Sequence, residues 1–278
     1  MLPVGPLVST EWLAEHLDHS ILRPADVRWY LGEPERGRAA YLSGHIPGAF
    51  YVDLDAHLSA EEGPGRHPLP SWEVFAERMA GLGIGDKNVV VAYDDRGGAV
   101  AARLWWMLRA IGHQRTYVLD GGLTAWEADG GEVTGELPAH EGGDLSVNLQ
   151  LDRTVDRDQL KEGLGSVLTI DARAGDRFRG ENETIDPVGG HIPGAVNAPY
   201  ESNLGPDQRF LAAEVLADKY RHIGVGGDRE IVFYCGSGVT ACHDLLAIEH
   251  AGLGQARLYP GSWSDWSTAG YEVATGPE

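Results

Sequence analysis

Hydrophobic residues along the chain alternate between short unbroken runs and longer stretches with helical spacing. Residues 89–93 and 231–234 are continuous apolar runs, and residues 167–170 form a third. Such runs are typical of central parallel strands that are buried on both faces of a sheet. Helical spacing marks residues 72–82, 99–111 and 239–251. The alternation of strands and helices predicts an α/β fold with a parallel sheet flanked by helices.

The chain carries this pattern twice. The segment Gly-His-Ile-Pro-Gly-Ala at residues 44–49 recurs letter for letter at residues 190–195, 146 positions later. Further pairs in the same order are Tyr93-Asp94 with Tyr234-Cys235, Gly121 with Gly261, and Trp126 with Trp266. A period of roughly 140 residues is far longer than that of a solenoid repeat, so the sequence indicates a duplicated domain.

The boundary between the two copies is predicted from composition. Residues 135–151 are polar, rich in glycine at their start and without periodicity, which is typical of a linker. We therefore predict an N-terminal domain over residues 1–134, a linker over 135–151 and a C-terminal domain over 152–278.

Charge and hydropathy narrow the class of partner. The formal net charge is −20 and the pI is near 4.8, so the surface field repels nucleic acid and anionic lipid. No apolar run approaches the roughly 18 residues of a membrane span, and the N-terminus lacks the pattern of a secretory signal. We expect a cytoplasmic protein with no nucleic-acid partner and no membrane association.

Cysteine usage points to chemistry at one position. Cys235 and Cys242 are too few for a disulfide framework and their spacing fits no zinc pattern, so we expect a reduced compartment, no metal and no cofactor. Cys242 lies on a predicted helix beside leucines and is interpreted as a packing residue. A lone buried cysteine is ordinarily just a small hydrophobe, and for Cys235 that interpretation competes with a reactive one.

The loop after Cys235 favours the reactive interpretation. Cys235 stands where a buried strand ends and a helix begins, the edge at which parallel α/β sheets bind ligands. Gly236 and Gly238 allow the backbone to curl so that successive N–H groups point at one sulfur atom. The N-terminus of the helix adds positive potential. Both effects favour a thiolate nucleophile.

These features together resemble a known family. The Cys235 loop, the doubled segment, and Asp171-Ala172-Arg173 followed by Arg-Phe-Arg-Gly at 177–180 are similar to the tandem rhodanese family of thiosulfate and 3-mercaptopyruvate sulfurtransferases, over nearly the whole chain. The resemblance implies two rhodanese-like domains, a catalytic C-terminal one and a non-catalytic N-terminal one in which Asp94 stands opposite Cys235. A phosphatase is disfavoured, because the Cys-x5-Arg loop it needs would place an arginine at Ala241.

The resemblance also implies a reaction and its partners. Cys235 would accept sulfur as a persulfide from a small-molecule donor and pass it to cyanide or to a thiol such as thioredoxin, in a protein expected to be a monomer. Ser237, His67 and Asp55 would form a proton relay. Arg177 would bind the donor's anionic group, with Arg179 as a nearby second cation. Donor-binding positions are further implied in the loop at Gly236, Gly238, Val239 and Thr240.

The identity of the donor is left open by the sequence. Gly-Ser after the nucleophile resembles the mercaptopyruvate enzymes, but these carry a second carboxylate-binding arginine where this chain has Asp186, nine residues after Arg177. An acid there would repel the donor's carboxylate unless it points away. 3-Mercaptopyruvate is the favoured donor and thiosulfate the alternative. A non-catalytic sulfur carrier or regulatory binding module is the alternative of another class.

Overall fold

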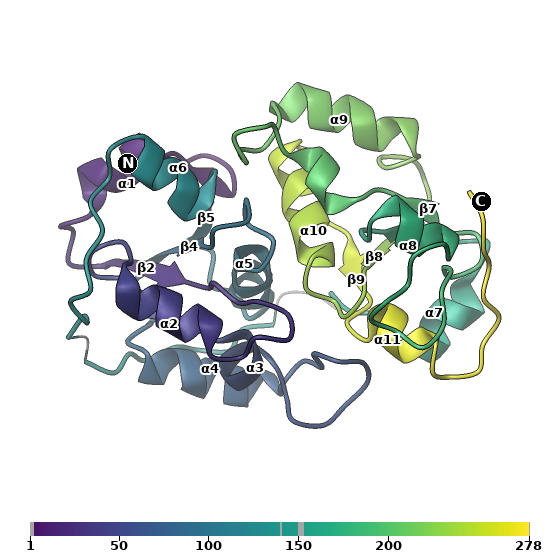
Figure 1. The fold of residues 1–278 in the computed structure, drawn as a ribbon, viewed down its shortest axis with the longest axis horizontal. Helices are drawn as coiled ribbons and strands as arrows, with labels where there is room; N and C mark the ends of the chain where they lie inside the picture. Colours follow the sequence, from purple (N-terminus) through teal and green to yellow (C-terminus); the bar gives the residue numbers. More distant parts are fainter. Residues whose placement is uncertain (1–2, 140, 150–152, 278) are drawn as a thin grey trace. The chain divides into compact units, whose positions relative to one another are not determined.

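A computed structural model describes residues 3–139, 141–149 and 153–277 (Figure 1). Contacts among these residues divide the chain into two compact units. Residues 3–60, 70–139, 141–149 and 205–210 form the first, and residues 61–69, 153–204 and 211–277 form the second. The predicted boundaries did not foresee that segment 61–69 groups with the second unit and segment 205–210 with the first. Both are loops without periodicity, so their packing could not be predicted from local pattern.

The first unit is a five-stranded parallel sheet with helices around it. Its strand order is β1-β5-β4-β2-β3. The strands are β1 (Leu7–Val8), β2 (Leu22–Asp26), β3 (Phe50–Tyr51), β4 (Val89–Tyr93) and β5 (Thr116–Leu119). The helices are α1 (Thr10–His16), α2 (Arg36–Ser43), α3 (Leu54–Leu58), α4 (Trp72–Gly81), α5 (Ala101–Ala110) and α6 (Gly122–Ala128). Every residue of the central strand β4 is buried, as its unbroken apolar run predicts.

The second unit repeats this plan with a four-stranded parallel sheet in the order β7-β6-β8-β9. The strands are β6 (Leu168–Asp171), β7 (Val196–Asn197), β8 (Ile231–Tyr234) and β9 (Arg257–Leu258). The helices are α7 (Arg157–Gly163), α8 (Gly175–Arg179), the 3-10 turn η1 (Tyr200–Asn203), α9 (Ala213–His222), α10 (Ala241–His250) and α11 (Ser262–Trp266). The predicted α/β class is confirmed. In the described parts of the chain, no helix is long and apolar enough to cross a membrane.

The duplicated segment has the same structural task in both copies. In the second unit, Nη2 of Arg173 pairs with Asp171 and also donates to the carbonyl of Gly190, both at 2.6 Å. Arg28 pairs in the same way with Asp26 in the first unit and reaches the equivalent carbonyl. Each arginine therefore fastens the start of the duplicated segment to the end of a central strand, which explains why this stretch is alike in the two units.

Candidate active site

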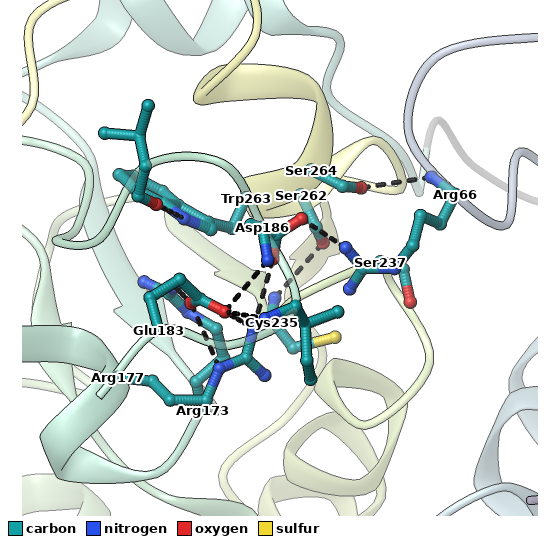
Figure 2. A network of polar contacts seen from close by, with 12 residues as sticks. Arg66, Arg173, Arg177, Glu183, Asp186, Cys235, Ser237, Ser262, Trp263 and Ser264 are labelled. Atoms are coloured by element: carbon teal, nitrogen blue, oxygen red, sulfur yellow. Dashed lines mark hydrogen bonds and ion pairs between the residues drawn. The ribbon is translucent and has the colours of Figure 1, made fainter. Parts of the chain in front are cut away.

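Cys235 follows β8 directly, and the first turn of α11 fixes its backbone (Figure 2). Its N–H donates to Oγ of Ser262 at 3.1 Å, and its carbonyl accepts from the N–H of Trp263 at 3.0 Å. The carbonyl of Gly236 accepts from the N–H of Ser264 at 2.9 Å. Because three hydrogen bonds hold three consecutive peptide units, the thiol is presented from a rigid loop at the carboxyl edge of the sheet.

Gly238 is needed at its position in the loop. Its φ is +74°, and a Cβ there would lie 2.5 Å from the carbonyl oxygen of Pro260. A side chain would be both strained and obstructed, so the tight curl predicted from the glycines is present. Thr240 occupies the N-cap position of α10, and the thiol of the fully buried Cys242 donates to the carbonyl of Gly238 at 3.4 Å. Cys242 therefore packs beneath the loop, in agreement with its interpretation as a packing residue.

The loop of the first unit shows what such a turn offers an anion. Asp94 stands opposite Cys235 in the repeat, and its buried carboxylate accepts four backbone hydrogen bonds. Oδ1 accepts from Arg96 at 2.8 Å and from Gly98 at 2.9 Å, while Oδ2 accepts from Val100 at 2.8 Å and from Ala101 at 2.9 Å. A strand-to-helix loop at this place concentrates N–H donors on one anionic group, which is the property a thiolate or persulfide requires.

Replacing this carboxylate should not create a second sulfur-carrying site. We predict that Asp94→Cys forms no persulfide at position 94, because the loop is one residue longer than that of Cys235 and places Arg96 where the active loop has Ser or Gly. A single sulfur atom cannot accept four N–H bonds, so the free energy of unfolding should fall by about 2 kcal/mol or more. Thermal unfolding and peptide mass spectrometry after donor treatment measure both effects. Asp218→Asn, at an exposed position, serves as the control, and a stable variant with sulfur on residue 94 would contradict the prediction.

Two members of the predicted relay lie together in the second unit. Nδ1 of His67 and Oγ of Ser237 share a hydrogen bond of 2.8 Å, and both residues are buried. His67 belongs to segment 61–69, so it reaches the loop from 170 positions earlier in the chain. Asp55 lies in the first unit on α3, where its Oδ2 accepts from Nε1 of Trp29 at 2.8 Å. Its place in the relay stays a prediction.

Arg177 sits in a network of carboxylates that sequence reasoning had not assembled. Its Nε and Nη2 donate to Glu183 at 3.1 and 2.9 Å, and Nη2 also reaches Asp186 at 3.1 Å. Asp186 in addition pairs with Arg66. The Asp186 carboxylate is thus held between two guanidinium groups (Figure 2). Its negative charge is compensated by these two cations, so Asp186 is not the uncompensated acid that would repel the donor's carboxylate.

Glu183 accepts two hydrogen bonds from Arg177 in this network. Burial alone would raise the pKa of Glu183, but hydrogen bonds from Arg177 and from the backbone N–H groups of Asp186 and Ile185 hold that pKa below its usual value. The carboxylate is therefore charged at neutral pH and fixes the Arg177 side chain. No repeat or strand pattern marked Glu183, and the nearest signal was its position in the acidic loop that follows α8.

Two other arginines near the site differ in their surroundings. Arg179 pairs with Glu181 at 2.7 Å and its side chain is 38% exposed, so its predicted role in donor binding stays a prediction. Arg173 is buried, with its guanidinium carbon 4.5 Å from the centre of the Trp263 ring. Burial lowers the pKa of Arg173, but the ion pair with Asp171 outweighs that effect and raises it. Arg173 is therefore a permanent cation that braces the site.

Comparison with known proteins agrees with this architecture. The family described as rhodanese-like domain matches residues 9–129 and 156–269. A probable 3-mercaptopyruvate sulfurtransferase of Pseudomonas aeruginosa is 44% identical over 269 residues, covering 94% of this chain and 95% of that protein. A putative thiosulfate sulfurtransferase of Mycobacterium tuberculosis is 43% identical over 253 residues, covering 87% of each. The crystal structure of the Escherichia coli 3-mercaptopyruvate sulfotransferase SseA superposes with a TM-score of 0.83 at 33% identity, covering 94% of this chain and 100% of that one.

Two α/β units of one plan, a cysteine in a rigid strand-to-helix loop of one of them, and the similarity to these enzymes together identify a sulfurtransferase. The chain belongs to the rhodanese family, with two tandem rhodanese-like domains. The sequence-based predictions of family, fold and enzyme class are confirmed.

Proposed function

We propose that this sulfurtransferase takes sulfur from 3-mercaptopyruvate and carries it on Cys235 as a persulfide. The observation that supports this donor is the hydrogen bond between His67 and Ser237. Ser237 lies two residues after the nucleophile Cys235. Loss of sulfur from 3-mercaptopyruvate leaves the enolate of pyruvate, which needs a proton. Thiosulfate leaves sulfite, which is stable as an anion, so a proton relay favours mercaptopyruvate.

In the first step the Cys235 thiolate attacks the sulfur atom of the donor. A sulfur–sulfur bond forms, the carbon–sulfur bond breaks, and its electron pair remains on carbon as the enolate. The hydroxyl of Ser237, polarised by His67, supplies the proton that converts the enolate to pyruvate. In the second step an acceptor attacks the outer sulfur of the persulfide and leaves the Cys235 thiolate free for another cycle.

The names of the relatives include both donors at almost equal identity, 44% and 43%, so similarity alone does not choose between them. Thiosulfate is the second candidate because Asp186 stands where the mercaptopyruvate group has an arginine. The proposal also includes an acceptor such as cyanide or a thiol, with thioredoxin as one thiol partner. It further includes a monomer that needs no cofactor and a cytoplasmic location.

A side-by-side kinetic comparison tests the donor. With one acceptor at a fixed concentration, kcat/KM for 3-mercaptopyruvate should exceed that for thiosulfate by about tenfold or more, since the proton relay assists the first alone. A preference for thiosulfate would replace the proposed donor by the alternative. Turnover with neither donor would favour the non-catalytic sulfur-carrier or binding module.

A further inference from the structure

The first turn of α10 carries a fully buried acid, Asp244. Its Oδ1 accepts from Nδ2 of Asn203 at 2.7 Å, whereas its Oδ2 is buried and has no hydrogen-bond partner among the described residues. A buried carboxylate with one bare oxygen is costly as an anion, because removal from water penalises the charged form. These contacts therefore favour the protonated carboxylic acid.

Asp244 is linked to the cation Lys219 through the amide of Asn203. Lys219 comes from α9, which packs against α10, and its Nζ donates to Oδ1 of Asn203 at 2.6 Å (Figure 1). The hydroxyl of Tyr220 donates to the same oxygen at 3.0 Å. Nδ2 of Asn203 donates to Asp244 and also to Nδ1 of His243, at 3.2 Å. The amide is thus fully used, and it bridges the acid and the cation.

Two further titratable groups lie on the strands beside α10. Burial has the largest effect on the pKa of Asp244, and the charge of Asp171 at the end of β6 raises that pKa further. Lys219 opposes these effects in part, and the pKa of Asp244 is raised to about 7. Tyr234 is the titratable residue of β8, and its hydroxyl accepts from the N–H of Ile192.

The position of Asp244 connects it to the Cys235 loop. Asp171, whose charge acts on Asp244, pairs in register with Tyr234, the residue before Cys235. The N-terminus of α10 offers positive potential to a sulfur anion, and a negative charge in the first turn of that helix would offset this potential. At an effective dielectric constant of about 20, a like charge roughly 10 Å away shifts a pKa by about one unit.

The first unit has a leucine at the equivalent place. The helices α5 and α10 have the same length and begin at Ala101 and Ala241, so Leu104 corresponds to Asp244. Leu104 is also fully buried. An apolar side chain therefore satisfies packing at this position, and the unit that contains Cys235 has an acid instead.

From this arrangement we infer that Asp244 is a positioning residue held as a neutral acid, whose proton keeps the positive end of α10 available to the sulfur anion on Cys235. The coupling is reciprocal, because a thiolate on Cys235 makes Asp244 harder to ionise by the same free energy. The inference rests on the proposed function for the anion on Cys235, whereas the proton on Asp244 can be measured by itself.

Infrared spectroscopy detects this proton directly, because the carbonyl stretch of a carboxylic acid is distinct from that of a carboxylate. The wild-type protein at pH 6 should show such a band, which should titrate with a midpoint near pH 7 and be absent in Asp244→Asn. Burial also raises the pKa of Asp26, so the band is assigned by its loss in the variant. If Asp244→Asn does not fold, Asp244→Leu assigns the band with the residue that the first unit has. Asp218→Asn, at a side chain 85% exposed, is the control and should keep the band.

The same band measures the coupling to the nucleophile. Cys235→Ser removes the thiolate and should lower the midpoint by about half a pH unit or more, equivalent to about threefold in the proton-binding constant. Cys242→Ser, also in the first turn of α10, should leave the midpoint unchanged. Absence of the band at pH 6, its persistence in the Asp244 variants, or an unchanged midpoint in Cys235→Ser would overturn the inference. A shifted midpoint in a protein that accepts no sulfur on Cys235 would support the coupling and contradict the proposed function instead.

Discussion

Replacement of Cys235 by serine is expected to lower sulfur transfer by at least about 10³-fold, with either donor. The serine oxygen cannot carry sulfur as a persulfide, and a hydroxyl is a far weaker nucleophile than a thiolate. Because the backbone of residue 235 is held by Ser262 and Trp263, the fold should be retained. Turnover at saturating donor, together with the thermal midpoint of unfolding, measures the two effects separately.

Cys242→Ser provides the matched control for this loss. Cys242 is equally buried and donates to the carbonyl of Gly238, a bond that a serine hydroxyl can also make. Its turnover should stay within a few-fold of the wild-type value. Comparable losses in both variants would mean that removal of either thiol merely disturbs the loop, and the assignment of Cys235 as the sulfur carrier would then fail.

Replacement of Ser237 by alanine is expected to slow turnover with 3-mercaptopyruvate more than turnover with thiosulfate. If its hydroxyl and His67 deliver the proton to the enolate, turnover with 3-mercaptopyruvate should fall by about 10²-fold or more. Thiosulfate should be affected much less, because sulfite needs no such proton. The quantity to measure is the ratio of kcat/KM between the donors in the variant, relative to the same ratio in the wild type.

Two further variants sharpen this test. His67→Gln removes the partner of the same hydrogen bond and should shift the donor ratio in the same direction. Ser202→Ala removes an exposed hydroxyl on η1 and should shift nothing. Equal losses on both donors in Ser237→Ala would mean that Ser237 only shapes the loop, and thiosulfate would become the better assignment.

The parts of the fold with strong local pattern were predictable from the sequence. The unbroken apolar runs at 89–93 and 231–234 coincide with β4 and β8, because burial on both faces leaves no polar position in such strands. The duplicated segment revealed the two domains. The predicted helix at 239–251 begins later, at Ala241, since residues 239 and 240 complete the curl of the active loop.

The surroundings of the nucleophile were less accessible to sequence reasoning. Cys235 and the residues of its loop are consecutive in the sequence, so their chemistry could be predicted from that segment alone. Arg66 comes from a loop without periodicity and pairs with Asp186 across 120 positions of the sequence. Asp186 was interpreted from its own charge, and that charge gives no information about the two arginines that compensate it. Long-range ion pairs between loops decide this part of the site, and a single sequence contains no signal for them.

The mass of the purified protein after treatment with one equivalent of 3-mercaptopyruvate tests the central claim most directly. The account predicts a gain of about 32 Da, the mass of one sulfur atom, on the peptide that contains Cys235. The gain should disappear when cyanide or a thiol is added, as the persulfide passes its sulfur to the acceptor. An unmodified Cys235 peptide while pyruvate is released, or sulfur found on Cys242 instead, would contradict the account.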